Sequence, residues 1–495
     1  MLDPMVESRR WSPLARAIGS WCLLGSGLAC HVEASFGAAW SETDVGSGTN
    51  PSTGEAGDGS TTAEPSSGSD TSSGSDTNDL PPSMQPPPYE PARYPGYQTH
   101  SPITPYVADQ IREIALLGPD KVEDVFLKTG ASSTVNHNTL FCFAEGPVEL
   151  ADHEPLQGTL DYYLGGDAAG TTPFDRVSDA AASGQHAGWA IFGDPSPIDL
   201  EVSMLSPRVA LVHFGANDMG WGANYGESLV HYHWTMMLLI DGLILEGVVP
   251  VVFGITRRGD SNLAQKWVDT WNATSRAIAQ SRQIPYVDLF NAIDGLPGHG
   301  LSSDGLHLEA YSGGACILDE EALQHGYNVR NLVALEVLDR AVAVLEDDAE
   351  GLDEAQPPLE GQGTPDAPWI IDELPFTDAR NTAMEGAPFV DTYPGCSNDS
   401  DESGPELWYR LDVTETVRVR AIALDMEGVD IDMHLVDQSA TGEGCIERGN
   451  TFVEATLEPG TYHFVLDTWV SDGTPLAGEL QFVLVECDDA DGACD

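Results

Sequence analysis

Residues 209–218 read Val-Ala-Leu-Val-His-Phe-Gly-Ala-Asn-Asp. Their first part is a short apolar run with β-branched side chains, which predicts a buried strand over 209–214. A long apolar stretch at 227–247 predicts a helix, and a second apolar run follows at 248–255. Two apolar strands joined by a long helix are typical of a parallel sheet that is covered by helices.

The same alternation extends over residues 94–350. Further strands are predicted at 125–130 and 285–289. Further helices are predicted at 106–117, 261–281 and 328–346. We therefore expect a three-layer α/β/α domain around a parallel sheet. In such sheets ligands bind beyond the carboxyl ends of the strands, so the chemistry should follow each strand directly.

Residues with catalytic chemistry do follow the predicted strands. Ser132 and Ser133 come after the first strand, Asn217 after the second, and Asp304 and His307 after the fourth, across a glycine-rich loop. A serine hydroxyl is a weak nucleophile that needs an imidazole base, which a carboxylate orients. An acyl oxyanion needs preorganised N–H donors, which Asn217 and nearby backbone can supply. The order and joint placement favour an acyl-transfer site over separate structural roles.

These segments resemble the SGNH (GDSL-type) hydrolase family over residues 100–348. The family's Gly-Asp-Ser block corresponds to Gly-Ala-Ser at 130–132. Its Gly-x-Asn-Asp block is intact at 215–218, and its Asp-x-x-His block is intact at 304–307. The family also has a glycine that donates a backbone N–H, for which Gly188 is the best candidate and Gly184 the second.

The resemblance implies an enzyme, a serine hydrolase that cleaves acyl or acetyl esters without a metal or an organic cofactor. Ser132 would be the nucleophile, His307 the base and Asp304 the residue that orients it. The Ser132 and Gly188 backbone N–H groups and the Asn217 side chain would form the oxyanion hole. The substrate class stays open between small-molecule and polysaccharide esters, and an acyltransferase would share the same acyl-enzyme.

One position departs from the family pattern. Ala131 stands where the family has Asp. This loss of a hydrogen-bonding group leaves open a second hypothesis, a non-catalytic surface protein that binds carbohydrate or mediates adhesion with the same fold. Ser133 is the competing nucleophile, although Ser132 keeps the spacing of the block.

Composition excludes some classes of partner. The chain has 495 residues, with 79 acidic and 21 basic side chains and a formal net charge of −58. Nucleic-acid binding needs clustered Lys and Arg, so we expect no nucleic-acid partner. The same charge disfavours electrostatic docking on anionic lipid.

The N-terminus predicts export. Three arginines precede or enter a small apolar run at 17–29, which is too short to span a bilayer and has the length of a signal peptide. The run ends at Cys30, so residues 1–30 are expected to be a lipoprotein-type signal with lipidation at Cys30. Simple secretion is the alternative. Residues 31–93 are rich in Ser, Thr, Gly, Asp and Pro and predict a disordered spacer. We expect a protein held at the cell surface or outer membrane, with membrane contact through the lipid anchor only.

The C-terminal third predicts a second domain. Residues 351–368 read as a linker and 488–495 as an acidic tail. Residues 369–487 contain short, closely spaced β patterns, which predict a β-sandwich. The stretch Leu-Glu-Pro-Gly-Thr-Tyr at 457–462 resembles the bacterial pre-peptidase C-terminal type of module. The expected strands are 407–411, 417–424, 431–436, 452–457, 462–467 and 480–485.

Two groups of residues could suggest a metal, but neither predicts one. His231 and His233 are two apart on a predicted helix, so their side chains point in different directions. Asp430, Asp432 and Asp437 could bind Ca²⁺, yet exposed acids are expected on a chain this acidic.

The cysteines indicate an oxidising compartment. Six of the eight follow the apolar N-terminal segment, and none forms a Cys-x-x-Cys pair. Spacing does not fix their connectivity, so the expected pairs rest on proximity along the chain: Cys142–Cys316, Cys396–Cys445 and Cys487–Cys494.

Overall fold

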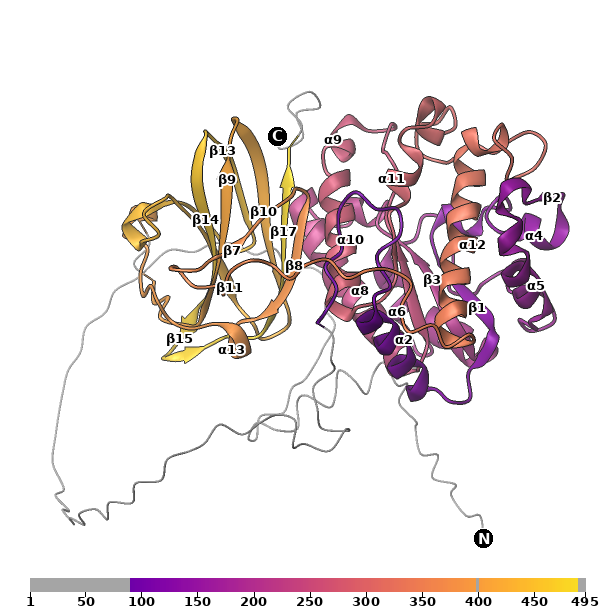
Figure 1. Ribbon diagram of the computed structural model, residues 1–495, viewed down its shortest axis with the longest axis horizontal. Coiled ribbons are helices and arrows are strands. Elements are labelled where there is room, and N and C mark those ends of the chain that lie inside the picture. Colours follow the sequence, from indigo (N-terminus) through magenta and orange to yellow (C-terminus); the bar gives the residue numbers. More distant parts are fainter. Residues whose placement is uncertain (1–89, 398–399, 488–495) are drawn as a thin grey trace, which may run out of the picture. The chain divides into compact units, whose positions relative to one another are not determined.

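A computed structural model describes residues 90–397 and 400–487 (Figure 1). The predicted signal peptide, Cys30, nearly all of the spacer and the acidic tail lie outside these residues. The backbone is hydrogen-bonded to the domain from the first few described residues. Ala92 is buried, with its backbone N–H and carbonyl both bonded to the side chain of Gln283.

The central domain is built on a four-stranded parallel sheet, as predicted. Its strands are β1 (Val122–Gly130), β3 (Pro207–His213), β4 (Val249–Phe253) and β5 (Tyr286–Val287), and they neighbour one another in chain order. A connection between neighbouring parallel strands must cross over a face of the sheet. In this domain helices form these crossover connections.

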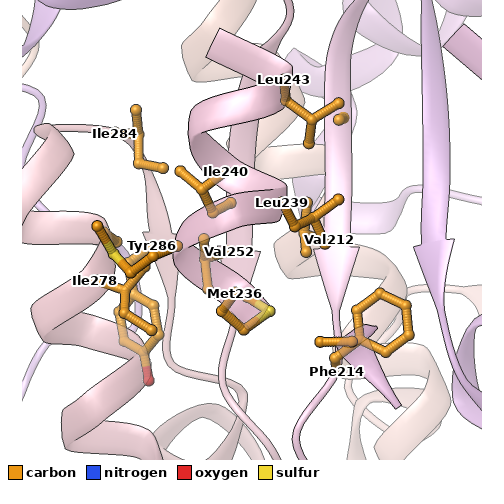
Figure 2. Packing of buried hydrophobic residues seen from close by; sticks show 14 of the residues in the cluster. Val212, Phe214, Met236, Leu239, Ile240, Leu243, Val252, Ile278, Ile284 and Tyr286 are labelled. Atoms are coloured by element: carbon orange, nitrogen blue, oxygen red, sulfur yellow. The ribbon is translucent and has the colours of Figure 1, made fainter. Parts of the chain in front are cut away.

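Side chains of each strand alternate between two cores. Ala210 and Val212 of β3 pack into one core, whereas Val209 and Leu211 pack into the other. The first core also holds α2 (Pro105–Leu117), α8 (Tyr225–Leu245) and α10 (Val268–Arg282), and the second holds α5 (Gln157–Gly165) and α12 (Gly326–Leu345). Figure 2 shows Met236, Leu239, Ile240 and Leu243 of α8 in the first core, together with Val212 of β3 and Val252 of β4. Sheet and flanking helices thus form the three predicted layers.

Helix α8 is apolar around most of its circumference. It is long and apolar enough to cross a membrane by length and composition alone. Leu229, Tyr232 and Met236 are nevertheless fully buried inside the domain. The side chain of Asn224 caps its first turn by accepting the backbone N–H of Glu227. Helix α8 is therefore the central core helix of this domain.

Two predicted elements differ in extent. The helix expected at 261–281 is interrupted, giving α9 (Asn262–Gln265) and α10, and Trp267 at the break stacks on Tyr225. The strand expected at 285–289 stops at Val287. Asp288 accepts the backbone N–H of Asn291 and so begins α11 (Leu289–Ile293) instead.

Shorter elements complete this domain. They are α3 (Ser132–Val135), α4 (Phe141–Glu145), β2 (Val148–Glu149), η4 (Ala151–Leu156), α6 (Ala187–Ile191), α7 (Pro197–Leu205), η5 (Asp218–Gly220), η6 (Pro297–Gly300), β6 (Cys316–Ile317) and η7 (Ala322–Gln324).

The C-terminal residues form two sheets, which confirms the predicted β-sandwich. One has the order β13-β10-β17-β8 and the other β12-β11-β14-β9-β7. Pairing is antiparallel except between β7 and β9. The strands are β7 (Trp369–Ile370), β8 (Phe376–Asn381), β9 (Glu406–Val413), β10 (Val417–Asp425), β11 (Ile431–Val436), β12 (Cys445–Gly449), β13 (Phe452–Leu457), β14 (Gly460–Thr468) and β17 (Glu479–Glu486). The remaining elements are α13 (Thr382–Glu385), η8 (Pro394–Cys396), η9 (Gly442–Gly444), β15 (Val470–Ser471) and β16 (Thr474–Pro475).

Three of these strands were not predicted. β7 and β12 are short, and β8 carries polar side chains at Thr377, Asp378 and Arg380. The sequence of β8 therefore lacks the apolar alternation of a half-buried strand. Partners distant in sequence supply its burial, since it pairs with β17 and packs against α10.

Two of the three expected disulfides are present. Cys142–Cys316 joins α4 to β6, and Cys396–Cys445 joins η8 to β12. The third expected pair includes Cys494, which lies outside the described residues.

Candidate active site

Ser132 stands at the first turn after β1. The strand ends at Gly130, and Ser132 begins α3. A Cβ at Gly130 would lie 2.2 Å from Thr134 Oγ1 and 2.6 Å from the His213 carbonyl oxygen, so this tight turn requires glycine. Ala131 is the residue before α3, and its side chain makes no cap bond there. An Asp, as in the family pattern, could accept an N–H at that point.

Asp304 organises the loop that carries His307. Its Oδ1 accepts bonds from the Ser302 hydroxyl at 2.8 Å and from the Leu306 and His307 backbone N–H groups, both at 2.9 Å. Its Oδ2 lies 2.7 Å from Nδ1 of His307. The His307 bond, followed by the two backbone donors, holds the pKa of the Asp304 carboxyl well below its usual range. The carboxylate is therefore ionised, and its exposure to solvent also favours the charged form.

The other ring nitrogen of His307 reaches the predicted nucleophile. Nε2 of His307 lies 3.0 Å from Oγ of Ser132. At Ser133, the competing candidate, the backbone carbonyl oxygen accepts a hydrogen bond from the Thr139 hydroxyl. The structure thus brings Ser132, His307 and Asp304 into one hydrogen-bonded chain, with the order that nucleophilic serine chemistry requires.

Asn217 lies in the loop after β3. The loop turns at Gly215, whose φ of +122° favours glycine. The side-chain amide of Asn217 donates to the carbonyl of Gln185 at 3.0 Å. An amide nitrogen carries two donors, so the second N–H is available to a ligand.

Asp218 links this loop to the segment that contains Gly188. It is 1% exposed, and its two oxygens accept the backbone N–H groups of Gly215 and Ala187, both at 2.8 Å. Burial raises the pKa of Asp218 to about 6, against the lowering effect of these donors. The Gly-x-Asn-Asp motif contains Asp218, but the sequence predicts no role for it. The structure makes it the residue that fixes the start of α6, where Gly188 is the second residue, against the Asn217 loop.

The second glycine candidate lies outside any helix. Gly184 has a φ of +78° and no atoms near an added Cβ. Gly188 is buried beside the ring of His186. Gly188 follows Ala187, whose backbone N–H donates to Asp218 at 2.8 Å. This short link to the Asn217 loop distinguishes Gly188 from Gly184.

A family model matches part of this domain. Residues 154–311 match the model of the GDSL-like lipase/acylhydrolase family. The chain contains a GDSL-like hydrolase domain. The match includes Gly188, Asn217, Asp304 and His307 and begins after Ser132. It supports an enzyme that hydrolyses ester bonds.

Solved structures resemble parts of the chain. A GDSL-like lipase from Bacteroides thetaiotaomicron is 14% identical, with 48% of this chain and 99% of that chain covered and a TM-score of 0.28. An acetyl xylan esterase from Geobacillus stearothermophilus is 14% identical, with 44% and 94% covered and a TM-score of 0.29. The pre-peptidase C-terminal domain of a Bacillus anthracis collagenase is 14% identical, with 26% and 98% covered and a TM-score of 0.17. No curated protein matches the chain.

Buried cations of the GDSL-like domain include Lys128 and Arg330. Lys128, in β1, donates to the Phe174 carbonyl at 2.6 Å and lies 4.1 Å from the centre of the Phe141 ring. Burial lowers the pKa of Lys128 to about 7. Arg330 of α12 donates to Nδ1 of His213 at 3.2 Å. No sequence pattern pointed to Lys128 or Arg330. A Lys within a strand is ordinarily expected at the surface.

Aromatic side chains extend from the Gly188 and Asn217 segments of the GDSL-like domain. The ring of His186 lies 3.5 Å from that of Trp221, and His231 lies between His186 and Trp234 at about 6 Å from each. Phe192 continues this strip at 6.1 Å from Trp234. Trp221, Trp234 and Phe192 are 54%, 39% and 46% exposed. Exposed aromatic groups of this kind mark binding surfaces.

The structure assigns the other candidate histidines to packing. His233 is buried and bonds to Gln481 at 3.0 Å, while His231 belongs to the aromatic strip. This agrees with the expectation that His231 and His233 do not form a metal pair.

Proposed function

We propose that the GDSL-like domain hydrolyses esters with Ser132 as nucleophile, His307 as general base and Asp304 as the orienting carboxylate. The observation that carries this proposal is the continuous hydrogen-bonded chain between these side chains, with distances of 3.0 and 2.7 Å. Both lie in the range that a nucleophile and its base need for proton transfer.

In the first step Oγ of Ser132 attacks the acyl carbon, and its proton passes to Nε2 of His307. Negative charge develops on the acyl oxygen. The backbone N–H groups of Ser132 and Gly188 and the free amide N–H of Asn217 stabilise it. The tetrahedral intermediate then collapses, and the alcohol leaves with the proton from His307.

In the second step water replaces the alcohol. His307 takes a proton from water, and the resulting hydroxide attacks the carbonyl carbon of the acyl-enzyme. The second tetrahedral intermediate collapses, the proton passes from Nε2 of His307 to Oγ of Ser132, and the carboxylic acid leaves. Asp304 holds the Nδ1–H tautomer of the imidazole and stabilises the imidazolium that forms twice in each cycle.

Labelling with a fluorophosphonate tests the nucleophile directly. An activated serine displaces fluoride from phosphorus and becomes covalently modified. We expect one label on the intact protein, none on Ser132→Ala, and full labelling of the matched control Ser133→Ala. Short p-nitrophenyl esters should follow the same pattern.

The second candidate function is a non-catalytic surface protein, which Ala131 favours. The same experiment separates the two. An intact protein that takes up no label and hydrolyses no ester would support the binding function. Loss of label only in Ser133→Ala would move the nucleophile by one residue.

We further propose a carbohydrate ester as the substrate. The exposed rings of Trp221, Trp234 and Phe192 offer apolar faces on which the apolar faces of sugar rings can stack. Trp234→Ala should raise KM for acetylated polysaccharide several-fold and leave KM for p-nitrophenyl acetate unchanged. Trp469→Ala in the C-terminal domain is a matched control, because Trp469 is also 39% exposed. Equal effects on both substrates would contradict a role in sugar binding.

For location, we propose a lipid anchor at Cys30. The support is the signal-like apolar run that ends at this cysteine and the spacer that follows it. The protein made in a bacterium should partition into detergent, and Cys30→Ala should release it into the soluble fraction. If both forms are soluble, simple secretion replaces lipidation.

A further inference from the structure

A loop covers the outer face of the five-stranded sheet in the C-terminal domain. We call residues 386–397 and 400–405 the covering segment. The Cys396–Cys445 disulfide fastens it to β12, and the ring of Tyr393 stacks on that of His434 in β11. The two ring centres are 3.5 Å apart and the planes 8° from parallel. Tyr393 and His434 are both fully buried.

Carboxylates are concentrated beneath this segment. Glu402, Glu406, Asp432 and Asp467 are each at most 2% exposed. Arg448 pairs with Glu402 and Asp432. Burying ionised carboxylates is costly unless cations or hydrogen bonds compensate them, and a single guanidinium neutralises one charge. The cluster therefore favours a further positive charge.

Glu406 and Asp467 also share a single donor. The hydroxyl of Tyr393 lies 2.7 Å from Oε2 of Glu406 and 2.9 Å from Oδ2 of Asp467. A phenol has one proton, so it can donate fully to only one of the two. Glu406 is otherwise bonded, since its Oε1 accepts the backbone N–H groups of Phe389 and Val390.

Buried atoms of the cluster without a hydrogen bond among residues 90–397 and 400–487 include Nε2 of His434, Oδ1 of Asp467 and Nε of Arg448. A buried polar atom in that state costs about 1–3 kcal/mol. Glu402, His434 and Asp467 each direct a ligand atom to the same place, and these atoms all lie within 4.8 Å of one another. The unbonded imidazole nitrogen is the observation that distinguishes this place from an acidic cluster alone.

We propose that Glu402, His434 and Asp467 bind a divalent transition-metal ion, with Zn²⁺ as the ion that best fits this ligand set. Zinc takes imidazole nitrogen together with carboxylate oxygen, whereas Ca²⁺ takes six to eight oxygens. Ligand atoms of a tetrahedral site with bonds of about 2.0 Å are roughly 3.3 Å apart. Binding would therefore draw these side chains together by about 1 Å.

The surroundings prepare the imidazole for this role. Stacking on Tyr393 fixes the plane of the ring. Orientation by neighbouring groups is typical of metal-binding histidines.

The ligands come from three separate parts of the domain. Glu402 belongs to the covering segment, His434 to β11 and Asp467 to β14. A bound ion would tie the covering segment to two strands of the sheet, and the disulfide ties the same segment to β12. The ion would thus stabilise the outer side of the C-terminal domain, independently of ester hydrolysis.

The test uses the full-length protein freed of metal with a chelator. Isothermal titration with ZnCl₂ and elemental analysis should give one Zn²⁺ per chain, and the melting temperature should rise on binding. His434→Gln should lose both the stoichiometric binding and the rise. His463→Gln is the control, because His463 lies in β14 on the same side of the sheet and already bonds to the carbonyl of Asp437. It should bind like the intact protein.

Glu402→Gln and Asp467→Asn serve as second variants. Circular dichroism identifies those that are folded, and cobalt replacing zinc reports the ligands through its visible absorption, which should change in each folded variant. Unchanged binding in His434→Gln, no binding to the intact protein, or stabilisation by Ca²⁺ without binding of Zn²⁺ would each overturn the proposal. Ester hydrolysis by chelator-treated protein is measured alongside, so that a failure of this site is distinguished from a failure of the active site.

Discussion

The Nε2 atom of His307 lies 3.0 Å from the Oγ atom of Ser132, although 175 residues separate them. Ser132 follows β1, and His307 lies in a loop that comes later in the chain than β5. The parallel strands all end at one edge of the sheet, which is why residues so distant in sequence can meet there.

Asn217→Ala should lower kcat about 10²–10³-fold, which corresponds to about 2.7–4 kcal/mol of transition-state stabilisation. The reason is that, in the proposed mechanism, the second N–H of its side-chain amide donates to an oxyanion that forms only during the reaction. KM should change much less. Steady-state kinetics with a short p-nitrophenyl ester measures both constants, and Asn291→Ala is the control. A change confined to KM would mean that Asn217 binds the ground-state substrate.

Asp304→Asn should lower kcat about 10³–10⁴-fold and leave the fold intact. Asn keeps the oxygen that accepts the Ser302, Leu306 and His307 donors, but it places an NH₂ group opposite Nδ1 of His307 and so favours the wrong tautomer.

The matched control for that variant is Asp294→Asn. Asp294 forms a similar pair with His299, 3.0 Å apart, in a neighbouring loop. Its activity should stay near that of the intact protein. Comparable losses in the two variants would argue against a specific role for Asp304.

The Ser132–His307–Asp304 chain should contribute a single ionisation, with a slope of one, to the acid limb of the pH profile. His307 must be neutral to accept the serine proton, so activity falls as the pH falls and the imidazole takes up a proton. Asp304 adds no second step, because the His307 bond and the backbone donors hold its pKa well below the usual range. The measurement is log kcat/KM against pH, with circular dichroism to verify folding. A slope of two would show that a second group titrates with the histidine.

Lys128 should make stability rise with pH above neutrality. Its pKa is lowered from 10.5 to about 7 in the folded protein, so the unfolded chain binds more protons between these values. Stability therefore increases as the pH rises through this range. From pH 7 to pH 9 the increase in the free energy of unfolding is about 2 kcal/mol.

Urea denaturation at both pH values measures this increase. Lys128→Met should lack the part of the increase in the free energy of unfolding that Lys128 contributes. Lys121→Met should retain it, because Lys121 lies just before the first residue of β1. Identical pH dependence of the intact protein and Lys128→Met would refute the assignment.

Much of the architecture could be predicted from local sequence. The apolar runs before Gly130 and Gly215 predicted β1 and β3, because strands buried on both faces need continuous apolar sequence. Boundaries were less certain where a side chain ended an element, as Asp288 does by capping α11. The strand β8 could not be predicted, because α10 and β17 supply its burial.

By itself the sequence determined the parallel α/β fold, the β-sandwich and the candidate set Ser132, Asn217, Asp304 and His307. These follow from local periodicity and from residue types at strand ends. Only the tertiary structure decided which hydroxyl His307 reaches, that Asp218 fixes the Gly188 segment, and that a ring nitrogen of His434 lies without a hydrogen bond near Glu402 and Asp467. The reason is physical: hydrogen bonds and burial depend on the distance in space between atoms, and the packing of separate elements sets that distance.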